Sequence, residues 1–399
     1  MNSAWHTPGF LIALLFFLLT PATSWAFKIS PCLRVLTYSP GVLAADKLNI
    51  LNPCNLGPEA YRLPVHEQLT NFSINEYKGG GFIANAQDEN FPKTPATQKL
   101  NYRHLEAWNK PPSERKHSTS DLIYGSWWND DPLMFLWSEG QNFRLGVEKL
   151  NKLFSSKIES RYPGGGDYDC NPLRKENLAW NSHFGTLQHL HFMSTVAKGD
   201  TINNPLDTTL DKSLEWIEFA YSVATQKIPY NAKLTRDEES RLYLPSMASN
   251  LCLKDDSKVT IRTLFSRPDF DDDRRKNMIP DVALGSIFHV IQDSFSPSHT
   301  CRIEEIVDGK KYAVLTDTYN YIRQDKHIHG KLDYFPQWLL DYSRTGIHKY
   351  ENDPVKVGTW LLHAVDAGTP WPEVKAHLLN SIFMRASNPR PAGVKCIGT

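Results

Sequence analysis

The order of apolar and polar residues along the chain predicts a mainly helical protein. Apolar positions recur with a helical period in 213–226 (SLEWIEFAYSVATQ), 360–365 and 374–383, as they do on the buried face of an amphipathic helix. Another helical pattern starts at Pro64. Residues 27–63 are instead rich in Pro, Gly and Asn, which is typical of irregular chain. We therefore expect an all-α fold, a single helical domain with long loops.

The first 26 residues have the pattern of a secretory signal peptide. A short polar segment leads into an apolar run from Phe10 to Leu19, and small residues follow at 22–24 and at 26. The run is too short to span a bilayer and precedes a suitable cleavage position. We expect a secreted protein in which residues 1–26 are the signal peptide. Residues 27–399 show no linker or composition change, so they are expected to form one catalytic domain.

The stretch 284–302, LGSIFHVIQDSFSPSHTCR, contains a candidate metal site. His289 and Asp293 are four positions apart in an apolar run that begins just after Pro280, so they share one helix face. Pro297 is expected to end the helix, and His299 then approaches from another direction. Imidazole and carboxylate groups arranged in this way are typical zinc ligands. The simpler interpretation is a buried His–Asp hydrogen bond, which the spacing alone does not exclude.

Charge and cysteine content narrow the possible functions. Basic and acidic residues are equal in number, 44 each, so the charge pattern of a nucleic-acid-binding protein is absent and no nucleic acid is expected as partner. Six cysteines in an exported chain allow up to three disulfides, which would pin the loops, and Cys32–Cys54 is the pairing we favour. No C-x-x-C pair occurs, so zinc ligation by thiolates is not expected.

Several other motifs do not support a specific chemistry. H-E-Q-L-T at 66–70 has Thr70 where a zinc protease of the H-E-x-x-H class needs its second histidine. The glycine runs 79–81 and 164–166 lack the frame of a phosphate-binding loop. G-x-S-x-G, the nucleophile motif of serine lipases, is absent. The acidic cluster within 269–273 is interpreted as a solvated loop.

The pattern H-x-x-x-D-x-x-x-P-x-H at 289–299 resembles the signature of the zinc-dependent phospholipases C and the related single-strand nucleases. FHVIQDSFSPSHT is most similar to secreted phosphatidylcholine-hydrolysing enzymes of Pseudomonas and Legionella type. Further motifs resemble this family: a metal Asp before Pro in WWNDDP at 127–132, and S-H-F at 182–184. The interval between these two is longer than in the family. HIHGKLD at 327–333 resembles the later H-x-x-x-D or H-x-x-x-E motif.

The resemblance implies a set of zinc ligands. Asp130, His183, His289 and Asp293 would hold one zinc; His299, His329 and Asp333 a second; and His66 with the bridging Asp293 a third. Asp131 and His327 remain alternatives to Asp130 and His329. In the family the mature N-terminal Trp also binds the third zinc, but Trp25 lies far from His66 and is not included. His189 and His191 are expected to be core or supporting histidines.

The resemblance also implies an activity. Two or three zinc ions would activate water to hydrolyse phosphatidylcholine-type lipids into diacylglycerol and a phosphorylated head group, with Asp130 and Asp293 as the catalytic carboxylates. The expected partner is a phospholipid membrane surface, and the expected state is a monomer. Trp127 and Trp128 could contact a quaternary ammonium head group or pack in the core. The alternatives are a single-strand nuclease with the same metals and a lipid-binding module without catalysis.

Overall fold

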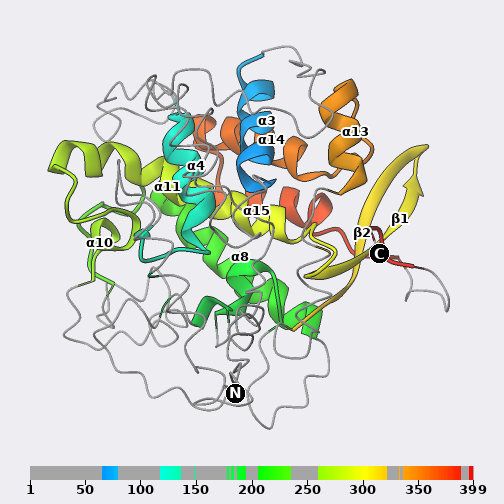
Figure 1. Ribbon diagram of the computed structural model, residues 1–399, viewed down its shortest axis with the longest axis horizontal. Coiled ribbons are helices and arrows are strands. Elements are labelled where there is room, and N and C mark those ends of the chain that lie inside the picture. The colour runs from blue at the N-terminus through cyan, green and yellow to red at the C-terminus, as the bar shows by residue number, and fades with distance from the viewer. Residues whose placement is uncertain are drawn as a thin grey trace, which may run out of the picture.

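The fold is mainly helical, with one small antiparallel sheet. The computed structural model describes residues 65–79, 117–135, 149, 178, 181–183, 187–194, 205–234, 259–320, 332, 336–387 and 395–398. The elements are α3 (Val65–Tyr77), α4 (Thr119–Trp128), the 3-10 helix η7 (Gln188–His191), α8 (Pro205–Ala224), α10 (Ile261–Phe265), α11 (Asp272–Asp293), β1 (Thr300–Val307), β2 (Lys310–Thr318), α13 (Gln337–Thr345), α14 (Pro354–Ala367) and α15 (Trp371–Asn380). The expected helical character is confirmed for this part of the chain (Figure 1).

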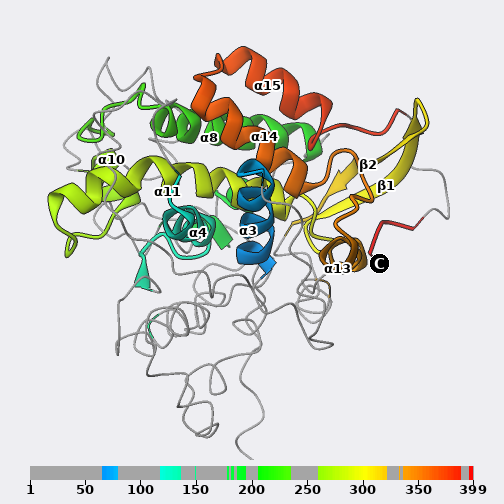
Figure 2. The same cartoon turned by 90° about the horizontal axis from the view of Figure 1, so that it is seen from above.

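Helix α11 runs through the middle of the described structure, between α8 on one side and α3 and α4 on the other (Figure 2). Every residue from Met278 to Asp293 is buried. The helix starts earlier than expected, because the Asp271 side chain accepts a hydrogen bond from Arg274 N and caps the first turn. The interpretation of 269–273 as a loop was therefore wrong for Asp272 and Asp273, which begin the helix, and Pro280 lies inside it.

Helices α4 and α11 cross at two glycines. A Cβ added to Gly285 would lie 2.2 Å from Leu122 O and 2.6 Å from Gly125 Cα, distances that no side chain tolerates. The backbones can approach this closely only because both positions lack a side chain. This crossing brings the C-terminal end of α4 against the last two turns of α11, where the candidate metal residues lie.

Helix α8 covers another side of α11 and extends the predicted helix 213–226 toward its N-terminus. Its Trp216 is fully buried and donates from Nε1 to Ser286 Oγ at 3.0 Å. Trp128 stacks on Trp216 with ring centroids 5.0 Å apart. The aromatic core therefore joins α4, α8 and α11.

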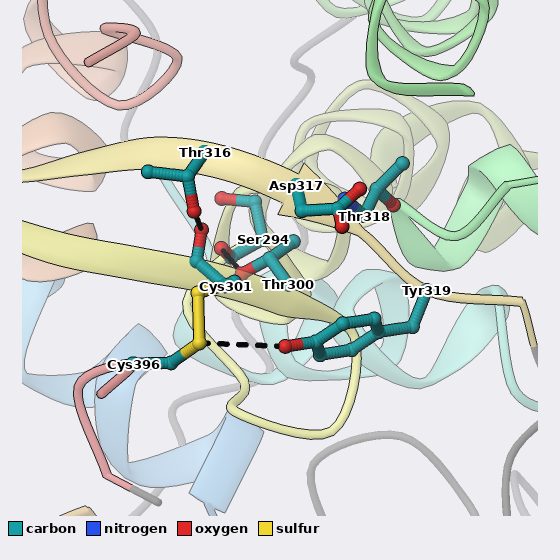
Figure 3. Close-up of a disulfide and its surroundings, with 8 residues drawn as sticks. All are labelled: Ser294, Thr300, Cys301, Thr316, Asp317, Thr318, Tyr319 and Cys396. Atoms are coloured by element: carbon teal, nitrogen blue, oxygen red, sulfur yellow. Dashed lines mark hydrogen bonds between the residues drawn. A yellow bond between two sulfur atoms is a disulfide. The ribbon is translucent and has the colours of Figure 1, made fainter. Parts of the chain in front are cut away.

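The all-α expectation is wrong for residues 300–318, which form the hairpin of β1 and β2. Asp308 and Gly309 both have positive φ values, 50° and 76°, as the favoured two-residue hairpin turn requires. The base of the hairpin is held by the Cys301–Cys396 disulfide (Figure 3). The favoured Cys32–Cys54 pairing and residues 1–26 lie outside the described residues. No helix in the described ranges is long and apolar enough to cross a membrane.

Candidate metal centre

A buried cluster of histidines and aspartates forms where α3, α4, η7 and α11 meet. The structure brings together six of the expected ligands and one histidine, His191, that was expected to be a core or supporting residue. His66 comes from α3, Asp130 follows α4, His183 lies in 181–183, His191 ends η7, His289 and Asp293 are on α11, and His299 precedes β1. None of the seven side chains is more than 4% exposed.

Asp293 lies at the middle of the cluster, and its two carboxylate oxygens face different imidazoles. Oδ1 is 3.4 Å from His66 Nε2. Oδ2 is 2.9 Å from His289 Nε2 and 2.9 Å from His191 Nδ1. This carboxylate can therefore contribute one oxygen to each of two metal positions.

Asp130 is the second carboxylate of the cluster. Its Oδ1 lies 3.5 Å from His183 Nε2 and 3.9 Å from His191 Nδ1, and its Oδ2 lies 4.0 Å from His289 Nδ1. No group of possible metal ligands found among the described residues contains Asp131. The geometry therefore favours Asp130 over its neighbour, and it places His183 beside Asp130 despite the long interval between them.

Hydrogen bonds fix the orientation of four imidazoles through Nδ1. His289 Nδ1 is 2.7 Å from Ser126 O, and His299 Nδ1 is 2.6 Å from His191 O. His66 Nδ1 is 2.6 Å from Gln292 Oε1, and His183 Nδ1 is 2.9 Å from Ser182 Oγ. An oxygen at Nδ1 leaves Nε2 as the nitrogen for a metal, which is the usual arrangement around a metal-binding histidine.

Asn129 positions Asp130. Its Nδ2 donates to Leu190 O at 2.7 Å, and its Oδ1 accepts from Ser286 Oγ at 2.6 Å. These bonds tie the C-terminal end of α4 to both η7 and α11. The same Ser286 hydroxyl accepts from Trp216 Nε1, so the support extends into the aromatic core.

His191 was expected to be a core or supporting histidine, but it lies within the cluster. Its Nδ1 is 2.9 Å from both Asp293 Oδ2 and His289 Nε2. Its ring orientation is opposite to that of the other four histidines, because Nδ1 is the atom directed into the cluster. Leu190 and Phe192 flank it in a buried turn, so the local sequence resembles ordinary core and contains no ligand motif.

Several polar atoms of the cluster have no hydrogen-bond partner among the described residues and lie close enough together to coordinate a cation. Three overlapping groups have ligand atoms within 4.8 Å of one another: His66, Asp130 and His289; Asp130, His183 and His191; and His191, His289 and Asp293. Both Asp130 oxygens, Asp293 Oδ1 and His191 Nε2 have no hydrogen-bond partner among the described residues. Such buried groups are costly unless something binds them, so the cluster could hold a metal ion.

Burial and neighbouring charges shift the pKa values of the two carboxylates and of the histidines around them. Burial disfavours ionisation of Asp293, but the neighbouring His289 and His299 outweigh it and hold the pKa of Asp293 well below its usual value. Burial and the neighbouring His289 have the same opposing effects on Asp130, whose pKa is also lowered. Burial lowers the pKa of His191 to about 3. Burial also lowers the pKa of His289, but Asp293 and Asp130 outweigh it and raise this pKa to about 9. Ionised carboxylates and a neutral His191 are protonation states that bind a metal, whereas binding through His289 requires that His289 lose its proton.

Two tryptophans considered for head-group contact belong to the interior. Trp128 is fully buried, stacks on Trp216 and donates to Leu264 O. Trp127 is 1% exposed and donates from Nε1 to Glu67 Oε1 at 2.9 Å. Both therefore pack in the core. Glu67 is a buried carboxylate next to His66. Apart from the incomplete protease motif, the sequence gave no reason to single it out.

The remaining expected ligands, His329 and Asp333, and the alternative His327 lie outside the described residues, as does Trp25, which was not included in the ligand set. Their predicted roles stay predictions. Comparison with protein-family models, curated proteins and solved structures found no match to this chain.

Proposed function

We propose that the chain is a secreted, zinc-dependent phospholipase C that hydrolyses phosphatidylcholine-type lipids on the glycerol side of the phosphate. Its products would be diacylglycerol and a phosphorylated head group. Two lines of reasoning support this: the motifs that resemble the zinc phospholipase C family, and a buried centre in which several of these motifs meet.

The observation that carries the proposal is the position of Asp293. One of its oxygens faces His66, while the other faces His289 and His191. A carboxylate placed between two sets of imidazoles is suited to bridge two metal ions. Paired metals of this kind are typical of enzymes that hydrolyse phosphodiesters.

Zinc fits the chemistry of the donor atoms. The cluster offers imidazole nitrogens and carboxylate oxygens without thiolates, a set that zinc accepts. Bound zinc would lower the pKa of a water molecule and stabilise the charge that develops on the phosphoryl oxygens. His66, His183, His289, Asp130 and Asp293 would hold the ions, with His299, His329 and Asp333 at a further position.

The residues of the chain supply rigidity and a dry environment. Asn129, Ser126 and Gln292 hold Asp130, His289 and His66 in fixed orientations. The cluster is almost completely shielded from water, which strengthens the attraction between the centre and an anionic phosphodiester. No side-chain nucleophile is required.

The test is an assay of the mature protein on phosphatidylcholine and on single-stranded DNA, side by side, with and without a chelator. We expect release of phosphocholine from the lipid, loss of this activity with the chelator and its recovery with zinc. Metal analysis of the purified protein should find two or three zinc ions per chain.

Three outcomes would overturn the proposal. Full activity on phosphatidylcholine after complete removal of metal would exclude a metal-dependent reaction. Cleavage of DNA with no cleavage of lipid would assign the centre to a nuclease. Metal binding without either activity would leave a lipid-binding module as the function.

A further inference from the structure

A short turn, residues 294–298, separates two of the expected metal ligands. Asp293 is the last residue of α11, and His299 directly precedes β1. The two residues are six positions apart in the sequence, yet His299 Nδ1 lies 3.6 Å from Asp293 Oδ2. The relative position of the two side chains therefore depends on what keeps this turn closed.

Arg302 holds the first two residues of the turn. Its side chain is buried, with 3% of the residue exposed. Nε donates to Ser294 O at 2.7 Å, and Nη2 donates to Ser294 Oγ at 3.0 Å. The ring of Phe295 lies against the guanidinium group, with its centroid 4.0 Å from Cζ. One side chain thus contacts both residues that follow Asp293.

The other bonds of Arg302 reach two distant segments. Nη1 donates to Ala313 O in β2 at 2.7 Å, and Nη2 donates to Ile382 O, just after α15, at 2.7 Å. A guanidinium group is planar and presents its donors in a fixed arrangement, so these bonds also fix its orientation. Arg302 therefore joins the end of α11 to the hairpin and to the segment after α15.

The charge of Arg302 is accommodated without a carboxylate from the described part of the chain, and burial lowers its pKa. Ser294 is the C-cap of α11, and Ile382 closely follows the end of α15. The group thus lies at the C-terminal ends of two helices, where the helix dipole favours a cation. The face of the Phe295 ring favours it as well. A buried cation is held beside the centre in this way without pairing with Asp293.

We propose that Arg302 is a positioning residue of the metal centre, which holds the turn in the shape that lets Asp293 and His299 bind zinc. This inference rests on the proposed metal centre and adds to it a residue that touches no ion. Metal ligands must be held within about 0.5 Å of the required geometry. A turn released from Arg302 would let His299 move relative to Asp293, and zinc would bind more weakly.

The fold itself has other support at the same places. Thr300 Oγ1 also donates to Ser294 O, at 2.8 Å (Figure 3). Asn352 Nδ2 also donates to Ala313 O, at 3.0 Å. Two of the three carbonyl groups that Arg302 bonds therefore keep a partner when Arg302 is replaced, and we expect the variants to fold.

The test uses the full mature protein, prepared free of metal. Arg302→Met removes every donor but keeps a long side chain, whereas Arg302→Lys keeps the charge on one nitrogen that cannot reproduce the planar group. Titration with zinc measures the affinity and the number of ions. The absorption spectrum of the Co²⁺-loaded protein reports the coordination geometry, and denaturant unfolding of the metal-free protein measures stability.

Arg302→Met is expected to bind zinc at least about tenfold more weakly than the wild type and to change the Co²⁺ spectrum. Arg302→Lys should lie between the two. The matched control is Asn352→Ala. Asn352 is fully buried and bonds Ala313 in β2 and Ser381 after α15, but it bonds no residue of the turn 294–298. Its replacement should lower stability and leave zinc affinity and the spectrum unchanged.

Wild-type zinc affinity and an unchanged spectrum in either folded Arg302 variant would overturn the inference. An equal loss of affinity in Asn352→Ala would also overturn it, because Arg302 would then support only the fold. No zinc binding by the wild type would overturn it together with the proposed centre. Failure of the proposed activity alone looks different: zinc binding would depend on Arg302, but phosphatidylcholine would not be cleaved.

Discussion

Gly125 and Gly285 lie back to back where α4 crosses α11, and a Cβ on Gly125 would be 2.6 Å from Gly285 Cα. This contact fixes the separation of α11, which carries His289 and Asp293, from α4, which Asp130 directly follows. The packing of the core and the geometry of the candidate centre therefore depend on the same two positions.

Gly285→Ala should lower both stability and metal binding. The added methyl group forces the helices apart, and overpacking of this kind costs about 3 kcal/mol of the free energy of unfolding. Denaturant unfolding and zinc content measure the two effects. Ala376→Ser on the exposed face of α15 is the control and should change neither. Wild-type stability in Gly285→Ala would show that the crossing is less tight than described.

Asp293→Asn should remove most of the bound metal and nearly all turnover. The amide keeps the shape of the side chain but removes the negative charge that two cations share. Asp281→Asn is a matched control, because Asp281 is a buried carboxylate on the same helix that faces His117. It should lower stability and leave the metal content intact. If Asp293→Asn keeps full zinc and activity, Asp293 is only a hydrogen-bond partner of His289.

His191→Ala should weaken zinc binding by at least about tenfold, the size of effect expected when a group at a metal site is lost. The reason is the 2.9 Å distance from His191 Nδ1 to Asp293 Oδ2. Titration of the metal-free protein with zinc measures the affinity without reference to activity. His189→Ala removes a buried neighbour that belongs to none of the candidate ligand groups, and it should bind zinc normally. Equal zinc affinities in His191→Ala and His189→Ala would show that His191 is a core histidine and takes no part in metal binding.

His117 should make stability depend on pH between about 6.5 and 9. Its Nδ1 lies 2.6 Å from Asp281 Oδ1 and its Nε2 lies 3.2 Å from Asp366 Oδ1. The other titratable groups nearby are Tyr77, the last residue of α3, and Lys78, which follows it. Burial lowers the pKa of His117, but the two carboxylates outweigh this and raise it from 6.5 to about 9. The folded state therefore holds the proton more tightly than the unfolded state.

The resulting stabilisation is complete below pH 6.5 and is lost as the pH rises through 9. The shift corresponds to a free energy on the order of 3 kcal/mol. Unfolding measured at a series of pH values should show this decrease in the wild type and a smaller one in His117→Gln. His363→Gln, which replaces an exposed histidine on α14, should keep the wild-type profile. Parallel profiles for all three proteins would contradict the assignment.

Short-range sequence patterns predicted the parts of the centre whose residues lie close together along the chain. His289 and Asp293 share a helix face because they are four residues apart, and α11 ends at Asp293, before Pro297. The predicted helix 213–226 is confirmed as far as Ala224, although α8 begins earlier than expected, at Pro205. The side chains of His66, Asp130 and His183 were placed near one another only through family resemblance, since no short-range rule relates positions so far apart.

The missed features depend on contacts between distant segments. His191 enters the centre because Asn129 and β2 fix the turn around η7: Asn129 bonds Leu190 O, and Thr318 Oγ1 bonds Phe192 O. The hairpin was overlooked although Asp308-Gly309 is a strong turn signal, because its strands are half in the core and half in solvent and so show no regular alternation. In the sequence, Asp271 has the pattern of an ordinary charged loop, so its role as the N-cap of α11 was not predicted.

More than half the length of the chain separates His66 from His299, and the candidate centre needs both ends of that interval. Contacts between such distant segments form late, because closing long loops costs entropy before the contact stabilises the fold. A nascent or partly folded chain therefore contains separate histidines but no complete binding site. Binding of metal by the whole centre is consequently a sign that folding is finished. A bound ion then acts as a crosslink and opposes the separation of α3 from the end of α11.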